Sequence, residues 1–441
     1  MGSIFGRDDP ETRSVNAAIE AVNRHARPLD DEQVRRLADR LCDRQVVCIG
    51  EASHGTSEFY RLRARLTAAL IEELDDAFVA VEGDWTDCYE VNRFVRGLSD
   101  HEDGRSVLAE FDRWPTWMWA NWEVRAFVEW LRAANARRDD DSEVGFYGMD
   151  VYSLFESMAA VVDYLEDTDP EAAQRARNAY HCFEPYEKDA RAYARSTRLV
   201  PEDCEDEVLS VLSELREDRP RHDNDHPDAW FNAEQNAVVA ANAESYYRAM
   251  VRGDVSSWNV RDRHMAETLD RLRDHHDDAT AIVWAHNTHV GDARATSMAE
   301  RGEVTVGQLV REAYGRDDVA LVGFGTHHGS VIAGRSWGAP MEQMRVPPAQ
   351  EGSYEHVLRR ADPTSCLLES EEIRETALSD TRGHRAIGVV YHPDRELGNY
   401  VSTDLPDRYD AFLYVEETEA LQPFDVEADE RETPEAYPWG L

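Results

Sequence analysis

The chain has 441 residues, of which 42% are hydrophobic, so it is long enough and apolar enough to fold around a large core and is not a disordered chain. Its formal charge is -41, from 89 acidic and 48 basic residues that are spread along the whole sequence. No basic patch stands out, which argues against nucleic-acid binding.

The negative charge also bears on where the protein works. A strongly acidic surface stays hydrated and tolerates its own repulsion where salt screens it. We therefore favour adaptation to a salt-rich cytoplasm, as in halophilic archaea, over an acidic protein that captures a basic partner. The six cysteines contain no CxxC pair, so we expect reduced thiols. We expect neither a signal peptide nor a membrane span, and we place the chain in the cytoplasm.

Short apolar runs rich in β-branched residues alternate with longer helical patterns such as Glu58–Leu74 and Glu123–Ala136. Strands that alternate with helices predict an α/β fold, in which helices flank a mostly parallel central sheet. The strands are expected near Val46–Ile49, Phe78–Val81, Val144–Tyr147, Ala281–Trp284, Val319–Phe324, Ile387–Tyr391 and Ala411–Val415.

The interval between the third and fourth predicted strands has helical patterns and no convincing strand. We therefore predict an α/β core of residues 1–152 and 273–441. A helical insertion of residues 153–272 is expected to act as a lid and to form one wall of a cleft. Its helices are expected at Phe155–Glu166, Pro170–Tyr180, Tyr186–Ser196, Glu202–Arg216 and Phe231–Met250.

Ionisable residues follow the first predicted strand directly, and three later strands end in the same way. Catalytic groups collect at the carboxyl ends of parallel strands, so these side chains are expected to converge. A His exchanges protons near neutral pH, and a carboxylate can orient it. A helix-capping or turn-forming role stays open for the Asp at the third strand end. The residues are Glu51 and His54, then Glu82, Asp150, and His286 with His289.

Two further segments carry candidates. Arg261 precedes the fourth predicted strand, and its planar guanidinium suits a carboxylate or a carbonyl oxygen, although pairing with a surface acid is an equal alternative. Trp117 lies in an aromatic-rich segment that lines an apolar pocket or, more commonly, packs in the core.

Two kinds of chemistry fit this residue set. One is hydrolysis by a water that a His activates, with other His or Arg side chains stabilising the oxyanion. The other is a zinc site of two His and a carboxylate, although neither His segment matches the helical H-E-x-x-H arrangement. Ser53 beside His54 is not expected to be a nucleophile, because no G-x-S-x-G elbow is present.

These motifs together resemble the erythromycin esterase family. The resemblance implies an α/β core with a helical part, a cleft between them, and ester hydrolysis by an activated water without a metal or another cofactor. The similarity covers nearly the whole chain and rests on Gly50–Thr56 with Glu58 and Phe59, Val81–Trp85, Phe146–Asp150, Trp258–Asp262, Trp284–His289 and Tyr391–Pro393.

The family motifs also imply roles. His54 is the implied general base and Glu82 its carboxylate partner, while Glu51, Arg261, His286 and His289 orient groups and stabilise charge. We further expect Asp150, Trp117 and Asn287 to bind the substrate.

The expected substrate is a small carboxylic ester or macrolactone, because the family includes macrolide-lactone hydrolases that confer antibiotic resistance. Two alternatives stay open. One is a metal-dependent hydrolase that uses the same His and Glu residues. The other is a homologue that binds a small molecule without turnover.

Overall fold

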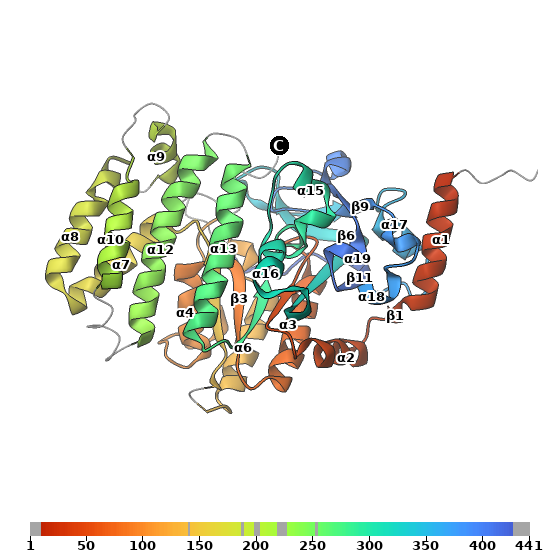
Figure 1. The fold of residues 1–441 in the computed structure, drawn as a ribbon, viewed down its shortest axis with the longest axis horizontal. Coiled ribbons are helices and arrows are strands. Elements are labelled where there is room, and N and C mark those ends of the chain that lie inside the picture. The colour runs from red at the N-terminus through yellow and green to blue at the C-terminus, as the bar shows by residue number, and fades with distance from the viewer. Residues whose placement is uncertain are drawn as a thin grey trace, which may run out of the picture. The chain divides into compact units, whose positions relative to one another are not determined.

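The computed structural model describes residues 10–139, 142–186, 189–197, 203–217, 227–251 and 255–426. The chain forms two compact units, coloured along the sequence in Figure 1. The first comprises Met1–Glu73 and Ala285–Gln422, and the second comprises Leu74–Trp284 and Pro423–Leu441.

The strands of the first unit follow the order β1-β8-β11-β6-β2. β6 lies between β11 and β2 and runs parallel to both of them. The other pairs are antiparallel: β8 with β11, β1 with β8, β7 with β6, and β9 with β10. The strands are β1 (Arg27–Pro28), β2 (Val46–Ile49), β6 (Val319–Gly334), β7 (Met341–Val346), β8 (Cys366–Glu369), β9 (Arg382–Arg385), β10 (Tyr400–Thr403) and β11 (Ala411–Thr418).

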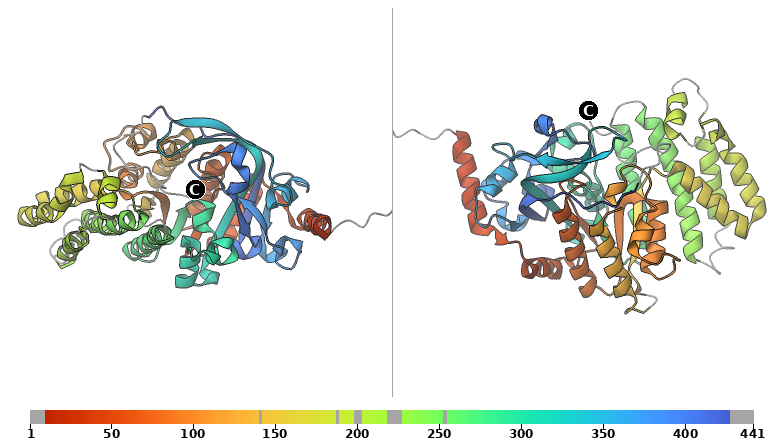
Figure 2. Two further views of the ribbon diagram at one scale, coloured as in Figure 1. Left: turned by 90° about the horizontal axis from the view of Figure 1, so that it is seen from above. Right: turned by 180° about the vertical axis from the view of Figure 1, so that it is seen from behind.

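The parallel strands of this unit are largely buried. All four residues of β2 are buried, as expected for an apolar strand covered on both faces. β6 is buried over its first eight residues and half-buried over the next four, and its last residues pair with β7 in a long curved hairpin (Figure 2).

The helices of the first unit form where apolar residues recur at helical spacing. α2 begins after Asp30, whose side chain accepts a hydrogen bond from the Gln33 amide and so satisfies one of the free amides at the helix start. α3 buries Phe59, Leu66 and Leu70 on one face. The α-helices are α1 (Pro10–His25), α2 (Asp31–Leu41), α3 (Ser57–Glu73), α14 (Asn287–Val290), α15 (Ser297–Glu300), α16 (Val306–Tyr314), α17 (Tyr354–Arg359), α18 (Ser370–Ile373) and α19 (Leu405–Arg408).

The second unit contains three parallel strands in the order β5-β3-β4. They are β3 (Ala77–Asp84), β4 (Gly145–Asp150) and β5 (Thr280–Trp284). Its helices are α4 (Trp85–Val95), α5 (Gly104–Leu108), α6 (Trp122–Asn135), α7 (Leu154–Thr168), α8 (Pro170–Tyr180), α9 (Ala190–Thr197), α10 (Glu205–Glu217), α12 (Pro227–Met250) and α13 (Ser256–His275), with short 3-10 turns that include Thr116–Met118 and His181–Tyr186.

The helices between β4 and β5 lie side by side, in yellow and green in Figures 1 and 2. α12 packs against α7, α10 and α13, and an apolar cluster that includes Val161, Tyr193 and Leu212 fills the space among α7 to α12. These helices and the three strands belong to the same compact unit. The division into a core and a lid stays a prediction.

Most of the predicted elements are confirmed, including the α/β class and the mostly parallel sheet. The strand predicted at Ile387–Tyr391 is wrong. Ile387 donates its amide to the Ala52 carbonyl, and Tyr391 donates to the Gly334 carbonyl, so the segment makes isolated bridges to two different neighbours. Without one continuous partner, no ladder forms.

The cysteines also differ from expectation. Cys182 and Cys204 form a disulfide within the second unit, where helix packing brings their Cα atoms to 6.1 Å although 22 positions separate them in sequence. The prediction of reduced thiols is wrong for this pair, whereas Cys42, Cys48, Cys88 and Cys366 are free. Within the described ranges, every helix is too short or too polar to cross a bilayer.

Candidate active site

The turn after β2 is held by close backbone contacts. A Cβ at Gly50 would lie 2.2 Å from the Asn287 Oδ1 atom, and one at Gly55 would lie 1.9 Å from the Ile332 carbonyl oxygen. The Asn287 amide donates to the Glu51 carbonyl at 2.8 Å, and the Ile332 amide donates to the Gly55 carbonyl at 3.0 Å. Glycine is therefore required at both ends of this turn, and the turn is rigid.

The turn presents a buried His–carboxylate pair. His54 Nδ1 lies 3.0 Å from Glu51 Oε1, and the two side chains are 5% and 2% exposed. The other Glu51 oxygen lies 2.9 Å from the Arg63 guanidinium of α3, in an ion pair whose angles are not those of a hydrogen bond. The Arg63 guanidinium also stacks over the Tyr60 ring at 4.2 Å. Glu51 is thus held from both sides.

His286 lies beside this pair. Its ring centroid is 4.8 Å from that of His54, with the planes tilted by 34°. His286 caps α14 by accepting a hydrogen bond from the Thr288 amide at Nδ1. Since Nδ1 accepts, the proton of neutral His286 is on Nε2. His289 follows on the same short helix and is also buried.

Asn287 makes structural contacts. Its Nδ2 donates to the Phe324 carbonyl on β6 at 2.7 Å, and its Oδ1 accepts from the Phe324 amide at 3.2 Å. Trp117 lies in the 3-10 turn Thr116–Met118 and is 1% exposed. Substrate binding by these two residues stays a prediction.

The second unit has its own buried ionic cluster. Arg261 of α13 donates from Nε and Nη2 to the two Asp150 oxygens at 2.9 and 2.6 Å, and Nη2 also donates to Glu82 at 2.7 Å. All three side chains are at most 2% exposed. Burial opposes the charge of Arg261, but Asp150, Tyr152 and Glu82 hold its pKa well above the ordinary value. The planar guanidinium of Arg261 thus binds two carboxylates of the protein, and a role of Arg261 toward a substrate stays a prediction.

Each predicted carboxylate has a partner within its own unit. Glu51 contacts His54 in the first unit, and Glu82 and Asp150 contact Arg261 in the second. The partner role that the family motifs implied for Glu82 stays a prediction.

Sequence reasoning missed three buried residues. Arg63 lies four residues after Phe59 and three before Leu66, on the apolar face of α3. A charged residue at that helical spacing indicates a buried ion pair, and this was the sequence pattern that could have identified it. His264 accepts from Asn242 at Nδ1 and contacts the Asp150 carbonyl through Nε2, and burial lowers its pKa to about 4.

The third missed residue is Arg113, which donates to Asp84 at 2.7 Å. Burial raises the pKa of Asp84, against the opposing effect of Arg113. No sequence motif pointed to Arg113.

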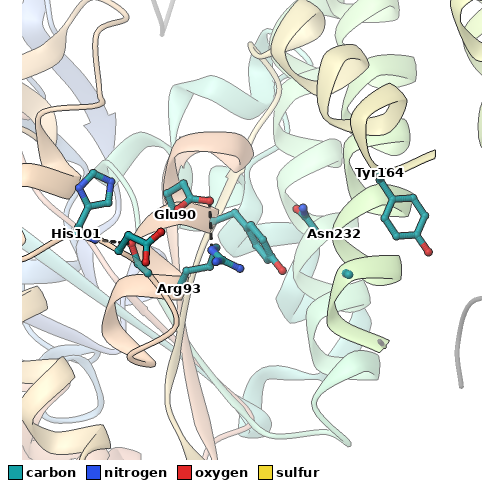
Figure 3. Close-up of a pocket in the computed structure, with 9 residues that line it drawn as sticks. Glu90, Arg93, His101, Tyr164 and Asn232 are labelled. Atoms are coloured by element: carbon teal, nitrogen blue, oxygen red, sulfur yellow. Dashed lines mark hydrogen bonds and ion pairs between the residues drawn. The ribbon is translucent and has the colours of Figure 1, made fainter. Parts of the chain in front are cut away.

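Among the described residues, no group of three or more His, Cys, Asp or Glu side chains is arranged to hold a metal ion. A cavity of about 490 Å³ lies in the second unit between α4, α7 and α12, and its described lining contains none of the predicted site residues. Figure 3 shows Glu90 and Arg93 of α4 facing one another there, opposite Tyr164 and Asn232.

Known proteins share this fold. The family model described as erythromycin esterase matches residues 71–418. The erythromycin esterase type II of Escherichia coli is 22% identical over 76% of this chain and 82% of its own length. The putative hydrolase YbfO of Bacillus subtilis is 21% identical over 90% of both chains. The structure of a mutant of the erythromycin esterase EreC in its open conformation superposes with a TM-score of 0.66 at 17% identity, over 90% of this chain and 96% of that one.

The chain belongs to the erythromycin esterase family, because the family model covers well over half of it. This membership supports an esterase-like hydrolase as the class of the protein.

Proposed function

We propose that the protein hydrolyses a carboxylic ester or macrolactone with a water molecule that His54 activates, without a metal ion. The observation that carries the proposal is the buried pair of Glu51 and His54, which a rigid turn presents at the end of β2. Family membership adds support for ester hydrolysis.

The mechanism follows from the two ring nitrogens of His54. Nδ1–H donates to Glu51, so Nε2 carries the lone pair and takes a proton from water. The hydroxide adds to the ester carbonyl, and the tetrahedral intermediate collapses with loss of the alcohol. The imidazolium returns its proton from Nε2 to the leaving oxygen. Glu51 stabilises the imidazolium while it lasts, and Arg63 keeps the Glu51 carboxylate in place.

His286 supplies a donor for the oxyanion in this proposal. Its proton is on Nε2 because Nδ1 caps α14, and its ring is next to that of His54. A donor fixed before the reaction stabilises the charge that develops on the carbonyl oxygen. The roles implied for His289, Glu82 and Arg261 stay predictions of the family resemblance, and substrate binding by Asp150 stays a prediction as well.

The test is hydrolysis of a panel of p-nitrophenyl esters and a macrolactone by protein purified in high salt. His54→Asn is expected to lower kcat by about 10²–10⁴-fold, because the general base is lost. His181→Asn, at a side chain that is 71% exposed and pairs with Glu184, is the control and is expected to keep wild-type activity. Full activity of the His54 variant contradicts the proposal.

The same protein preparations distinguish the proposed function from a metal-dependent hydrolase and from a binding protein without turnover. Activity is expected to persist after dialysis against a chelator, and elemental analysis is expected to find no stoichiometric metal. Stoichiometric zinc or manganese together with inhibition by the chelator favours the metal-dependent hydrolase. Saturable binding of panel members without hydrolysis favours a binding protein.

We also propose a salt-rich cytoplasm of the halophilic, archaeal type as the setting of this activity. Support comes from the formal charge of -41 on a chain whose apolar fraction is ordinary. The panel includes a macrolactone because the relative from Escherichia coli carries the name erythromycin esterase. Resistance to macrolides follows as a role only if the macrolactone is cleaved.

A further inference from the structure

A second His–carboxylate pair is buried in the first unit and takes no part in the mechanism above. His384 of β9 lies with Nδ1 2.7 Å from Glu355 Oε1 of α17, and both side chains are fully buried. The Arg385 amide donates to the same Glu355 oxygen at 2.9 Å. On its other side, His384 Nε2 lies 3.2 Å from Asn287 Nδ2. A buried carboxylate such as that of Glu355 needs hydrogen-bond partners that offset the loss of its hydration.

The orientation of the Asn287 amide fixes the protonation of His384. The Phe324 backbone has one donor and one acceptor of known identity, and they require Nδ2 at the carbonyl and Oδ1 at the amide. Nδ2 only donates, so His384 Nε2 accepts from it. His384 is therefore neutral, with its proton on Nδ1 and directed at Glu355.

Asn287 connects this pair to the two segments that carry the proposed catalytic groups, which are the Glu51–His54 turn and the start of α14 at His286. The backbone amide of Asn287 donates to the Glu51 carbonyl. Its side-chain Oδ1 packs so closely on Gly50 that no Cβ fits there. Asn287 also follows His286 directly in the chain. The backbone and side chain of Asn287 therefore together hold the Glu51–His54 turn next to His286.

We propose that Glu355 and His384 are positioning residues that act through Asn287 on the hydrolytic site. This inference rests on the proposed function, because it links these residues to the hydrolysis in which His54 activates water. The contacts that run from Glu355 through His384 to Asn287 are called the relay below. The relay holds Asn287 with an acceptor at His384 Nε2, and Asn287 holds both segments in register. A shift of about 1 Å in such groups is enough to lower a rate by about 10²-fold.

The relay also responds to protonation. A proton on His384 Nε2 would turn the acceptor into a donor that faces the donor Nδ2 of Asn287. Burial lowers the pKa of His384 and Glu355 opposes that effect, so this change belongs to the acid side of neutral pH. The charged, titratable and aromatic groups that face the His384–Glu355 pair include Arg385, Glu396, Tyr400, Arg408, Tyr409, Phe412 and Tyr414.

The test compares two substitutions at one position. His384→Leu removes both hydrogen bonds and is expected to lower kcat about 30- to 100-fold with KM changed less than about threefold. His384→Gln can accept from Asn287 and donate to Glu355, so it is expected to stay within about fivefold of the wild type. His276→Leu is the control, because His276 is a half-buried His that is hydrogen-bonded to Tyr147 in the second unit.

A pH profile separates positioning from a general loss of stability. His384→Gln is expected to keep a larger fraction of its best kcat on the acid side than the wild type does, because it cannot be protonated. Profiles that superpose overturn the inference, even where His384→Leu does not fold. A folded His384→Leu with wild-type kcat overturns it as well.

Failure of the proposed function is recognised separately. If the wild type hydrolyses no ester, the relay is tested by ¹⁵N NMR of histidine-labelled protein. His384→Leu is expected to move the His54 Nδ1 and His286 ring signals, whereas His276→Leu leaves them in place. Unchanged signals in both variants overturn the positioning role.

Discussion

Replacing Arg63 by Met removes the cation that pairs with Glu51 while it keeps an unbranched side chain against Tyr60. Arg63 and Glu51 are 1% and 2% exposed, and they form the ion pair at 2.9 Å. Removing one partner of a buried pair leaves the other charge uncompensated, which costs about 3–5 kcal/mol. We therefore expect Arg63→Met to lower the free energy of unfolding by about that amount and to lower kcat, because Glu51 no longer holds His54.

The double variant Arg63→Met/Glu51→Gln separates the two effects. It removes both charges, so most of the lost stability is expected to return, whereas activity stays low because no carboxylate orients His54. Urea unfolding in high salt, followed by circular dichroism, gives the stabilities. The control is Arg65→Met on the same helix, where Arg65 is 46% exposed and pairs with Asp31, and the expected loss is about 1 kcal/mol or less. An Arg63→Met variant as stable as this control refutes the reasoning.

Three further predictions concern stability, each measured by urea or thermal unfolding. Gly55→Ala places a methyl group 1.9 Å from the Ile332 carbonyl oxygen and is expected to cost about 3 kcal/mol or more, whereas Gly388→Ala, with nothing within 4 Å, is tolerated. Burial lowers the pKa of His264 from 6.5 to about 4, so the unfolded chain takes up that proton first. The free energy of unfolding is therefore expected to fall by up to about 3 kcal/mol as the pH drops from 6.5 to about 4, and His264→Gln is expected to flatten this pH dependence. Because the formal charge is -41, the unfolding temperature is expected to rise from low to molar salt, and no change with salt contradicts the halophilic interpretation.

The predicted strands succeeded where burial alone decides the structure. β2 and β5 are continuous apolar runs, and both were placed within one residue of their bounds. β9 has the sequence Arg-Gly-His-Arg and is a strand because it pairs with β10 and because His384 and Arg385 find buried partners. β7 is mostly exposed and takes its structure from β6. Local composition carries no signal for strands whose partners supply the stability.

The residues of the candidate site likewise differ in whether the sequence alone predicts them. Glu51 and His54 are three residues apart in a turn after an apolar strand, so sequence alone was enough to single them out. Their partner Arg63 and the relay residue Glu355 lie in helices of a chain with 89 acidic and 48 basic residues, where most charged side chains face solvent.

Helical spacing is what distinguishes the exceptions. Arg63 falls on the apolar face of α3 between Phe59 and Leu66, and Glu355 precedes the buried Val357 and Leu358 of α17. A charged side chain on the buried face of a helix must have a buried partner. For Arg63 that partner is Glu51, and for Glu355 it is His384. In an acidic chain, then, the charges that matter to the site are identified by the apolar neighbours around them, while the identity of each partner depends on contacts that only the folded chain provides.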